Sequence, residues 1–256
     1  MAAAGKPGKP GKPGKPDITV SASGHCSVEC NCETGNHTEC IAAWLGTPDA
    51  FQGCVSVSFR NADIDMAKIA KIINKQFLDI VYLNYKSCSD FRGVSNVFPN
   101  LITLVCNYTY KLHSLAGIEN LKLEELQVSD NQLSDLDPLK AHPSLCKLDI
   151  TGNRIKDLSA IASLRLSKLQ CNMCSLIDLD FLKGHPTLIT LHCWHNQIVS
   201  LAGLAGMTTL RELRCNNNNL STLKCLEGLT LDCIDVSSNP IQDCAISDIL
   251  KGDGKI

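Results

Sequence analysis

Apolar residues recur along this chain at a fixed interval. Residues 210–229 read LRELRCNNNNLSTLKCLEGL, with a cysteine where the apolar pattern would place a leucine and four asparagines after it. Similar segments stand 21 or 22 residues apart and begin at Ile80, Leu101, Leu123, Leu145, Leu166, Leu188, Leu210 and Leu231. A fixed period in this range is typical of stacked repeats. We therefore expect about eight repeats over residues 80–249.

Each repeat combines two apolar periods. The L-x-L segment alternates as a half-buried strand should, whereas the apolar residues after it fall three apart, which favours a tight helical turn. One unit cannot bury its own leucines, but parallel strands stacked side by side bury them continuously. The predicted fold class is α/β, a solenoid with a parallel concave sheet and short helical or 3-10 returns on its convex side.

An asparagine occupies one slot after most strands, as in Asn131, Asn153, Asn196, Asn218 and Asn239. At this slot the backbone turns inward and leaves amide and carbonyl groups without ladder partners. An inward asparagine carries donors and an acceptor that can satisfy the neighbouring turns. Cys88 and Cys174 take this slot in two repeats.

Four cysteines occupy the second strand slot of their repeats, namely Cys106, Cys171, Cys193 and Cys215. Ile150 and Val128 stand in this slot in sister repeats. Free cysteine behaves as a small buried hydrophobe, so we interpret all four as core residues.

The two ends of the chain depart from the repeat. Residues 1–17 contain four GKP triplets and are expected to form a disordered tail. Residues 18–79 are interpreted as a cysteine-rich cap and an irregular first repeat, with a strand from Cys54 and a helix from Met66. The chain closes with AISDILKGDGKI, where we expect a short capping helix and then a tail over residues 250–256.

These repeats resemble the leucine-rich repeat family, over about two thirds of the chain. The period is similar to that of phosphatase regulators, some dynein light chains and internalins. VFPNL, KAHPSL and KGHPTL, each with a proline two residues before the first leucine, support the resemblance. It implies the solenoid fold and a non-enzymatic scaffold for protein–protein interaction, such as a regulatory or adaptor subunit.

The N-terminal segment CSVECNCETGNHTEC is similar to the disulfide cap of extracellular leucine-rich repeat proteins. That resemblance implies the pairs Cys26–Cys32 and Cys30–Cys40, and a secreted or surface-attached recognition protein. Extracellular repeats are usually longer, however, and their C-terminal caps carry several cysteines, whereas the segment NPIQDC supplies only Cys244. A zinc-binding or redox protein is a further alternative, with ligands drawn from Cys26, Cys30, Cys32 and Cys40 and either His25 or His37. The third possibility for these cysteines is that they are unpaired surface thiols.

Charge and hydropathy narrow the classes of partner. A net charge of −2 gives no electrostatic footprint for nucleic acid, and the absence of an 18-residue apolar run argues against a membrane span. The N-terminus lacks the apolar core of a secretory signal, so we expect a cytoplasmic protein. We also expect a monomer, and we expect no cofactor. An extracellular or cell-surface location is the alternative.

Catalytic patterns are missing from the sequence. It contains neither a glycine-rich phosphate loop nor a serine elbow. HCWH at 192–195 suggests zinc, but a strand points His192 outward and Cys193 inward, so the two cannot easily share one ion. His142 and His185 each precede a proline in a return, which favours a structural or solvated role.

The outward strand positions of the concave face form the candidate site for a protein partner. Trp194 stands at one of them, and tryptophan is among the commonest binding hot spots. The predicted patch around it consists of Gln170, His192, His195, Arg214 and Asn216. Tyr82 and Tyr108 are predicted to form a second patch near the other end.

Overall fold

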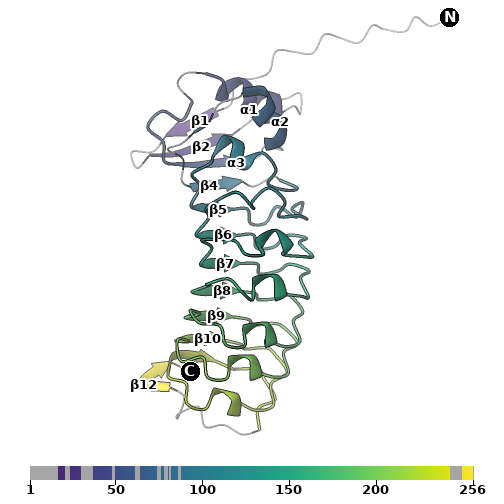
Figure 1. The fold of residues 1–256 in the computed structure, drawn as a ribbon, viewed down its shortest axis with the longest axis vertical. Helices are drawn as coiled ribbons and strands as arrows, with labels where there is room; N and C mark the ends of the chain where they lie inside the picture. Colours follow the sequence, from purple (N-terminus) through teal and green to yellow (C-terminus); the bar gives the residue numbers. More distant parts are fainter. Residues whose placement is uncertain are drawn as a thin grey trace, which may run out of the picture.

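The computed structural model describes residues 17–20, 24–29, 37–47, 50–60, 64–73, 76–77, 80, 82–85, 88–242 and 250–255. The molecule is an elongated column whose strands lie one above another along its long axis (Figure 1). The GKP tail, Cys30, Cys32 and residues 243–249 lie outside the described residues.

One sheet contains all of the strands in chain order. β1 pairs antiparallel with β2, and every later pair is parallel. The strands are β1 (Asp17–Val20), β2 (His25–Glu29), β3 (Ser56–Arg60), β4 (Tyr82–Tyr85), β5 (Thr103–Val105), β6 (Glu125–Gln127), β7 (Lys147–Asp149), β8 (Lys168–Gln170), β9 (Thr190–His192), β10 (Glu212–Arg214), β11 (Leu231–Asp235) and β12 (Leu250–Lys255). The parallel solenoid predicted from the period is confirmed.

The register of the repeats is uniform. The central buried residue of each strand pairs with its counterpart on the next, in the row Leu83, Leu104, Leu126, Leu148, Leu169, Leu191, Leu213 and Ile234. A slip by one residue would turn this row of side chains to solvent. The hydrophobic pattern therefore fixes which side chains face outward.

Short 3-10 helices form the returns opposite the strands (Figure 1). They are η1 (Asp137–Leu139), η2 (Ser159–Ile161), η3 (Asp180–Leu182), η4 (Ala202–Leu204) and η5 (Lys224–Leu226). A short polar side chain two residues before each helix accepts a hydrogen bond from its first N–H, as Asp157 does from Ser159 at 2.8 Å. The equivalent acceptors are Asp135, Asp178, Ser200 and Thr222. These caps satisfy an amide that the helix leaves unpaired.

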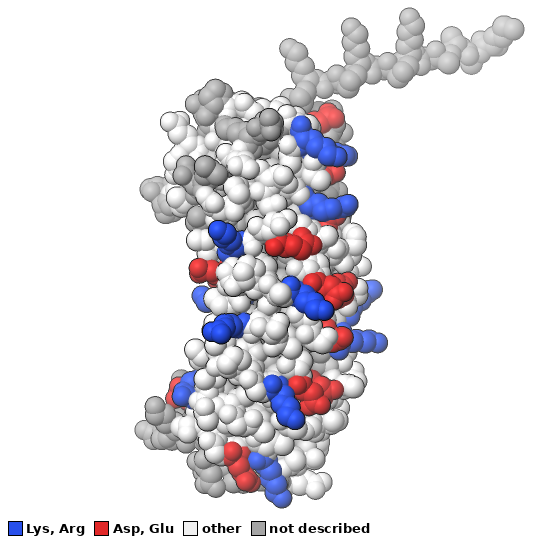
Figure 2. All heavy atoms as spheres, in the orientation of Figure 1, with Lys and Arg blue, Asp and Glu red and all other residues white. Residues whose placement is uncertain are grey.

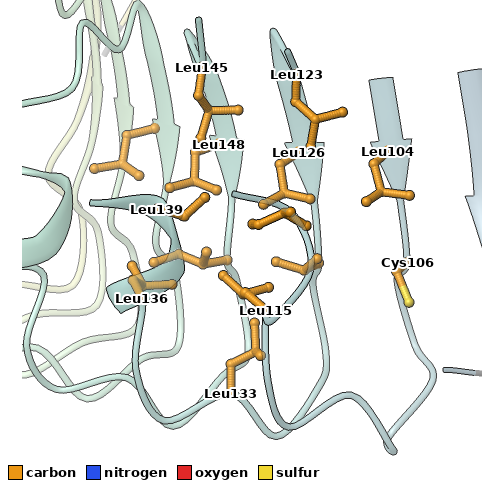
Figure 3. Packing of buried hydrophobic residues seen from close by; sticks show 14 of the residues in the cluster. Leu104, Cys106, Leu115, Leu123, Leu126, Leu133, Leu136, Leu139, Leu145 and Leu148 are labelled. Atoms are coloured by element: carbon orange, nitrogen blue, oxygen red, sulfur yellow. The ribbon is translucent and has the colours of Figure 1, made fainter. Parts of the chain in front are cut away.

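The core lies between the strands and the returns. Figure 3 shows Leu126 and Leu148 pointing from their strands toward Leu136 and Leu139 of a return. All four side chains are at most 2% exposed. Each repeat stacks on the next, so the leucines form one continuous apolar interior rather than separate clusters.

The asparagine ladder is confirmed. The Asn153 Nδ2 group donates to the carbonyl of Val128 in the preceding repeat at 2.8 Å and to that of Ile150 in its own repeat at 2.9 Å. Its Oδ1 accepts from the N–H of Leu133 at 3.0 Å. Cys174 takes the same slot and its thiol donates to the Ile150 carbonyl at 3.4 Å. The slot therefore satisfies turn carbonyls whichever of the two residues fills it.

A left-handed residue precedes this slot in seven consecutive repeats. Its φ lies between 52° and 68° in Tyr108, Asp130, Gly152, Met173, His195, Asn217 and Ser238. Asparagine, aspartate and glycine tolerate this conformation best. In the run of four asparagines, Asn217 thus provides the turn and Asn218 the ladder.

The N-terminal region closes the upper end of the column. Helix α1 (His37–Leu45) packs on α2 (Met66–Ile73), and α2 packs on α3 (Val94–Val97). The strand expected from Cys54 and the helix expected from Met66 are present as β3 and α2. Beneath them a cluster of buried rings fills the end of the core, formed by Trp44, Phe51, Phe59, Phe77, Tyr85 and Phe98.

The C-terminal end differs from the expected tail over residues 250–256, whereas the expected capping helix falls on residues 243–249, outside the described residues. Leu250–Lys255 form β12, which pairs with β11 with a shift in register between Leu231 and Cys233. The exposed edge of the last repeat is therefore covered by backbone pairing, because a parallel edge strand leaves unpaired amides and carbonyls.

Candidate functional site

Two rows of outward side chains run along the sheet, and we call this surface the strand face. The first row contains Tyr82, Thr103, Glu125, Lys147, Lys168, Thr190 and Glu212. The second contains Asn84, Val105, Gln127, Asp149, Gln170, His192, Arg214 and Asp235. Most of these side chains are polar, and both rows contain acidic as well as basic residues. Figure 2 likewise shows acidic and basic side chains interspersed down the length of the molecule.

Three residues of the predicted patch are direct neighbours. Gln170, His192 and Arg214 occupy the same register position on β8, β9 and β10. Glu212 joins two of them, because its Oε1 lies 3.0 Å from His192 Nε2 and 2.9 Å from Arg214 Nε. Burial alone would raise the pKa of Glu212, but the hydrogen bond and charge of His192, together with Arg214, hold that pKa below its ordinary value. Glu212 stands at an outward strand position. Strand alternation alone does not predict its bridging role, because that role depends on side chains that reach diagonally between strands.

Trp194 lies two residues beyond the end of β9 and is only partly buried. Its backbone N–H donates to Asn172 Oδ1 at 3.1 Å, which anchors the main chain and leaves the ring at the surface. The ring meets that of His195 edge to face, with centroids 5.2 Å apart. His195 N–H in turn donates to the Asn216 carbonyl at 3.0 Å. Trp194, His195 and Asn216, which we call the Trp194 group, therefore lie beside the row formed by Gln170, His192 and Arg214.

The third outward position is less open in two repeats than the alternation suggests. Ser129 and Asn172 stand there but are only 6% and 2% exposed. Asn172 Nδ2 donates to Thr151 Oγ1 at 3.0 Å while its Oδ1 caps Trp194. The chain has already begun its inward turn at this point, so small polar side chains at this position bond to neighbouring turns.

A hollow of about 160 Å³ lies on the strand face over β6, β7 and β8. It is lined by Glu125, Gln127, Lys147, Asp149, Lys168 and Gln170, together with two strand leucines. Pockets for small ligands are usually about 300–1,000 Å³. The hollow is therefore suited to a single side chain of a partner, and Gln170 connects it to the Trp194 group.

The two tyrosines of the second predicted patch lie apart. Tyr82 begins β4 and pairs with Thr103, whereas Tyr108 follows β5 at the left-handed turn and is 65% exposed. The two rings therefore belong to opposite ends of their strands. Burial, and then the charge of Glu125, raise the pKa of Tyr82. Tyr110, two residues farther along the chain, is 64% exposed.

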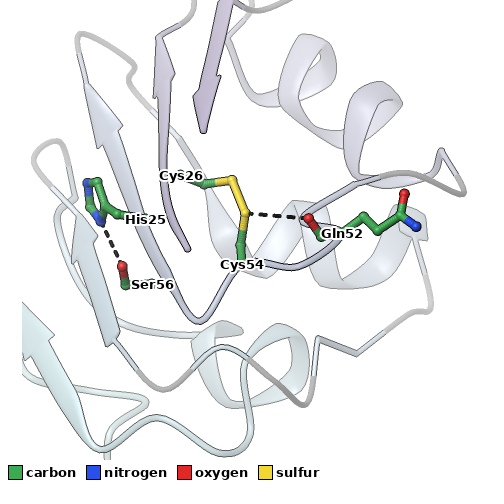
Figure 4. Close-up of a disulfide and its surroundings, with 5 residues drawn as sticks. All are labelled: His25, Cys26, Gln52, Cys54 and Ser56. Carbon is green, nitrogen blue, oxygen red and sulfur yellow. Dashed lines mark hydrogen bonds between the residues drawn. A yellow bond between two sulfur atoms is a disulfide. The ribbon is translucent and has the colours of Figure 1, made fainter. Parts of the chain in front are cut away.

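The N-terminal cysteines pair differently from the expected cap. Cys26 forms a disulfide with Cys54, 28 residues away, and not with Cys32 (Figure 4). Parallel pairing of β2 with β3 sets His25 opposite Ser56, so the residues just before β3 reach the start of β2. The zinc alternative also loses a ligand, because a disulfide sulfur is not a thiolate. Of the remaining pair, Cys30 lies outside the described residues and Cys40 is buried.

The strand cysteines are core residues, as predicted. Cys106, Cys171, Cys193 and Cys215 are 0% exposed. Burial raises the pKa of Cys215 to about 12, and burial with neighbouring thiols raises that of Cys193 well above its ordinary value. A nucleophilic cysteine needs the opposite shift.

His142 and His185 are 7% and 5% exposed. Each follows a return at a place that Leu121, Leu164, Met207 and Leu229 fill in other repeats. Because apolar residues fill the equivalent positions, the role of both histidines is structural, one of the two readings that the sequence favoured.

The described part of the chain contains neither a cluster of metal ligands nor a membrane-spanning helix. No group of three or more histidine, cysteine or acidic side chains is placed there to hold a metal ion. No helix there combines the length and apolar character needed to cross a bilayer.

Comparison with known proteins identifies the repeat. A family model described as leucine-rich repeats in two copies matches residues 121–163 and 186–230. No curated protein sequence matches the chain.

Three solved structures from Listeria monocytogenes are similar. Internalin C2 is 33% identical over 56% of this chain and 65% of its own, with a TM-score of 0.54. Internalin F is 24% identical over 84% of this chain and 69% of its own, with a TM-score of 0.66. The functional domain of InlJ, which includes a cysteine ladder, is 23% identical over 76% of this chain and 46% of its own, with a TM-score of 0.50. The chain thus spans just under two thirds of internalin C2.

Proposed function

This chain is a leucine-rich-repeat solenoid, and from that premise we propose that it is a non-enzymatic scaffold that holds a protein partner on its strand face. The observation that supports the proposal is the partly exposed Trp194 beside the register-paired row of Gln170, His192 and Arg214. A large ring at the edge of a rigid, polar sheet has the character of an interface anchor surrounded by polar contacts.

The chemistry of the strand face favours a folded protein over other ligands. It contains both acidic and basic side chains, and Glu125–Lys147 and Glu212–Arg214 already form ion pairs at 3.8 Å and 2.9 Å. Such a surface complements another mixed surface, whereas a phosphate backbone needs an excess of basic residues. The hollow over β6–β8 would take one partner side chain next to the tryptophan.

The test compares matched aromatic variants in quantitative pull-downs. Trp194→Ala removes the proposed anchor, whereas Tyr110→Ala removes a ring that is 64% exposed and lies five residues beyond the end of β5. We expect the first change to weaken a specifically retained partner by about 30-fold, equivalent to about 2 kcal/mol, and the second to leave binding unchanged. A partner retained equally by both variants would place the site elsewhere.

A second candidate is an extracellular or surface-attached recognition protein. The Cys26–Cys54 disulfide favours it, because structural disulfides persist in oxidising compartments. The 33% identity of this chain to internalin C2, over 56% of its length, is consistent with this location. Labelling intact source cells with a membrane-impermeant amine reagent tests it. Labelled chain on unbroken cells, or chain in the medium, supports an external location, and labelling only after lysis supports a cytoplasmic scaffold.

A further inference from the structure

A second pair of sulfur atoms meets where the N-terminal region joins the regular repeats. Cys88 follows β4 and Cys106 follows β5, and their Sγ atoms lie 2.7 Å apart. Carbon atoms, which are smaller than sulfur, already rest about 3.5–4.0 Å apart in non-bonded contact. The separation is therefore too short for two thiols that merely touch, and it is within about 0.7 Å of an S–S bond.

We propose that Cys88 and Cys106 form a structural disulfide that links the first two strands of the regular repeats. Both side chains are buried, with 2% and 0% of their surface exposed. Cys88 Sγ lies 3.7 Å from the carbonyl oxygen of Tyr85, whose hydroxyl donates to the Ile64 carbonyl just before α2, so the bond would lie where the repeats contact the N-terminal region. The proposed disulfide does not depend on a partner that binds the strand face.

The chain contains its own comparison for this pair. Cys88 takes the asparagine slot of its repeat and Cys106 the second strand slot of the next, and Cys174 and Cys193 hold the same two slots farther along. The Cys174 thiol, however, points back and donates to the carbonyls of Ile150 at 3.4 Å and Asn172 at 3.3 Å. Identical residues in identical slots therefore face each other at only one of the two places.

The oxidant required is a disulfide, such as oxidised glutathione or a protein disulfide donor. One cysteine thiolate attacks an oxidant sulfur, which breaks the oxidant's S–S bond and releases one thiol. The second thiolate attacks the mixed disulfide, forms the Cys88–Cys106 bond and releases the other thiol. Two electrons pass to the oxidant, and the two cysteine protons end on the released thiols. Because both sulfurs are buried in the folded chain, the reaction belongs to folding, before the stack closes.

Peptide mapping tests the bond directly. The full chain is folded in a glutathione redox buffer, alkylated in denaturant without reductant, and digested with trypsin. We expect peptides 87–92 and 93–111 joined and lighter by two hydrogens, with Cys174 and Cys193 alkylated as the internal control. Alkylation of both Cys88 and Cys106, or linkage of either one to another cysteine, would overturn the proposal.

A matched pair of variants tests the structural role. Val128 holds the slot of Cys106 in the next repeat, so Cys106→Val preserves the packing and removes only the bond, and Cys193→Val is the control. We expect Cys106→Val to melt roughly 5–10 °C below Cys193→Val when oxidised. A reductant should abolish that difference, because it opens Cys26–Cys54 in both proteins and Cys88–Cys106 only in the control. Equal melting temperatures before reduction would contradict the role.

Discussion

The asparagine ladder makes a sharp prediction within the run of four asparagines. Asn218 is 6% exposed and its Nδ2 donates to the carbonyls of Cys193 and Cys215, both at 3.0 Å. Its Oδ1 accepts from the N–H of Ile198 at 3.0 Å. Asn219, the next residue, is exposed. Replacing each by alanine therefore compares a buried amide with an exposed amide in adjacent positions.

The expected effect follows from the groups left behind. Asn218→Ala breaks three buried hydrogen bonds, each with a net contribution of about 0.5–1.5 kcal/mol. It also leaves two carbonyls and one amide without partners inside the stack, where an unmade bond is most unfavourable. We expect the free energy of unfolding to fall by about 2–4 kcal/mol. Asn219→Ala should change it by less than about 0.5 kcal/mol.

Urea unfolding followed by far-UV circular dichroism measures these differences. Asn218→Cys is a third variant, because Cys174 fills the same slot and donates to the Ile150 and Asn172 carbonyls. A thiol makes weaker bonds and supplies no amide oxygen, so this variant should lie between the other two. Equal losses for Asn218→Ala and Asn219→Ala, or cysteine less stable than alanine at position 218, would refute the reasoning.

Three other changes test the core. Burial lowers the pKa of His142 and His185, so the unfolded chain binds more protons, and stability should fall as pH drops below about 6.5. His142→Leu with His185→Leu should flatten that fall between pH 7.5 and pH 5 in urea titrations, and an unchanged slope would contradict it. Cys215→Val should keep the free energy of unfolding within about 1 kcal/mol of the parent, whereas Cys215→Ser should lower it by about 1–3 kcal/mol, because only serine buries a hydroxyl. Calorimetry compares the two variants, and equal losses would argue against an apolar slot. Gly117→Ala should lose about 3 kcal/mol in thermal unfolding, since φ is 103° and a Cβ would stand 2.4 Å from the Phe91 carbonyl carbon; parental stability would contradict this.

The period of the sequence was enough to predict the fold because one rule repeats. Each strand from β4 to β10 has a leucine at its central inward position, so the spacing of 21 or 22 residues determines the register of that part of the sheet. The slots for Asn153 and Cys215 follow from the same repetition. The disulfide did not follow, because Cys54 reaches Cys26 only through the pairing of β2 with β3, two irregular strands outside the periodic part. The resemblance to extracellular caps implied nearer partners instead.

The alignment of three candidate site residues could also be predicted from the repeating pattern. Strand alternation placed Gln170, His192 and Arg214 in one row, and the pairing of β8, β9 and β10 aligns them. Alternation fails at the third outward position, where the backbone has left the strand and turns inward. Asn172 is small and polar enough to fold back and bond to Thr151.

Trp194 occupies the equivalent position in the next repeat but cannot fold back in this way. Its ring is too large for the turn and packs instead against the exposed His195. The strand face is thus two side chains wide where Ser129 and Asn172 are buried, and three wide at Trp194. This local widening is the physical reason for placing a partner there, since an aromatic ring that stands above a flat polar sheet can enter a pocket on another protein.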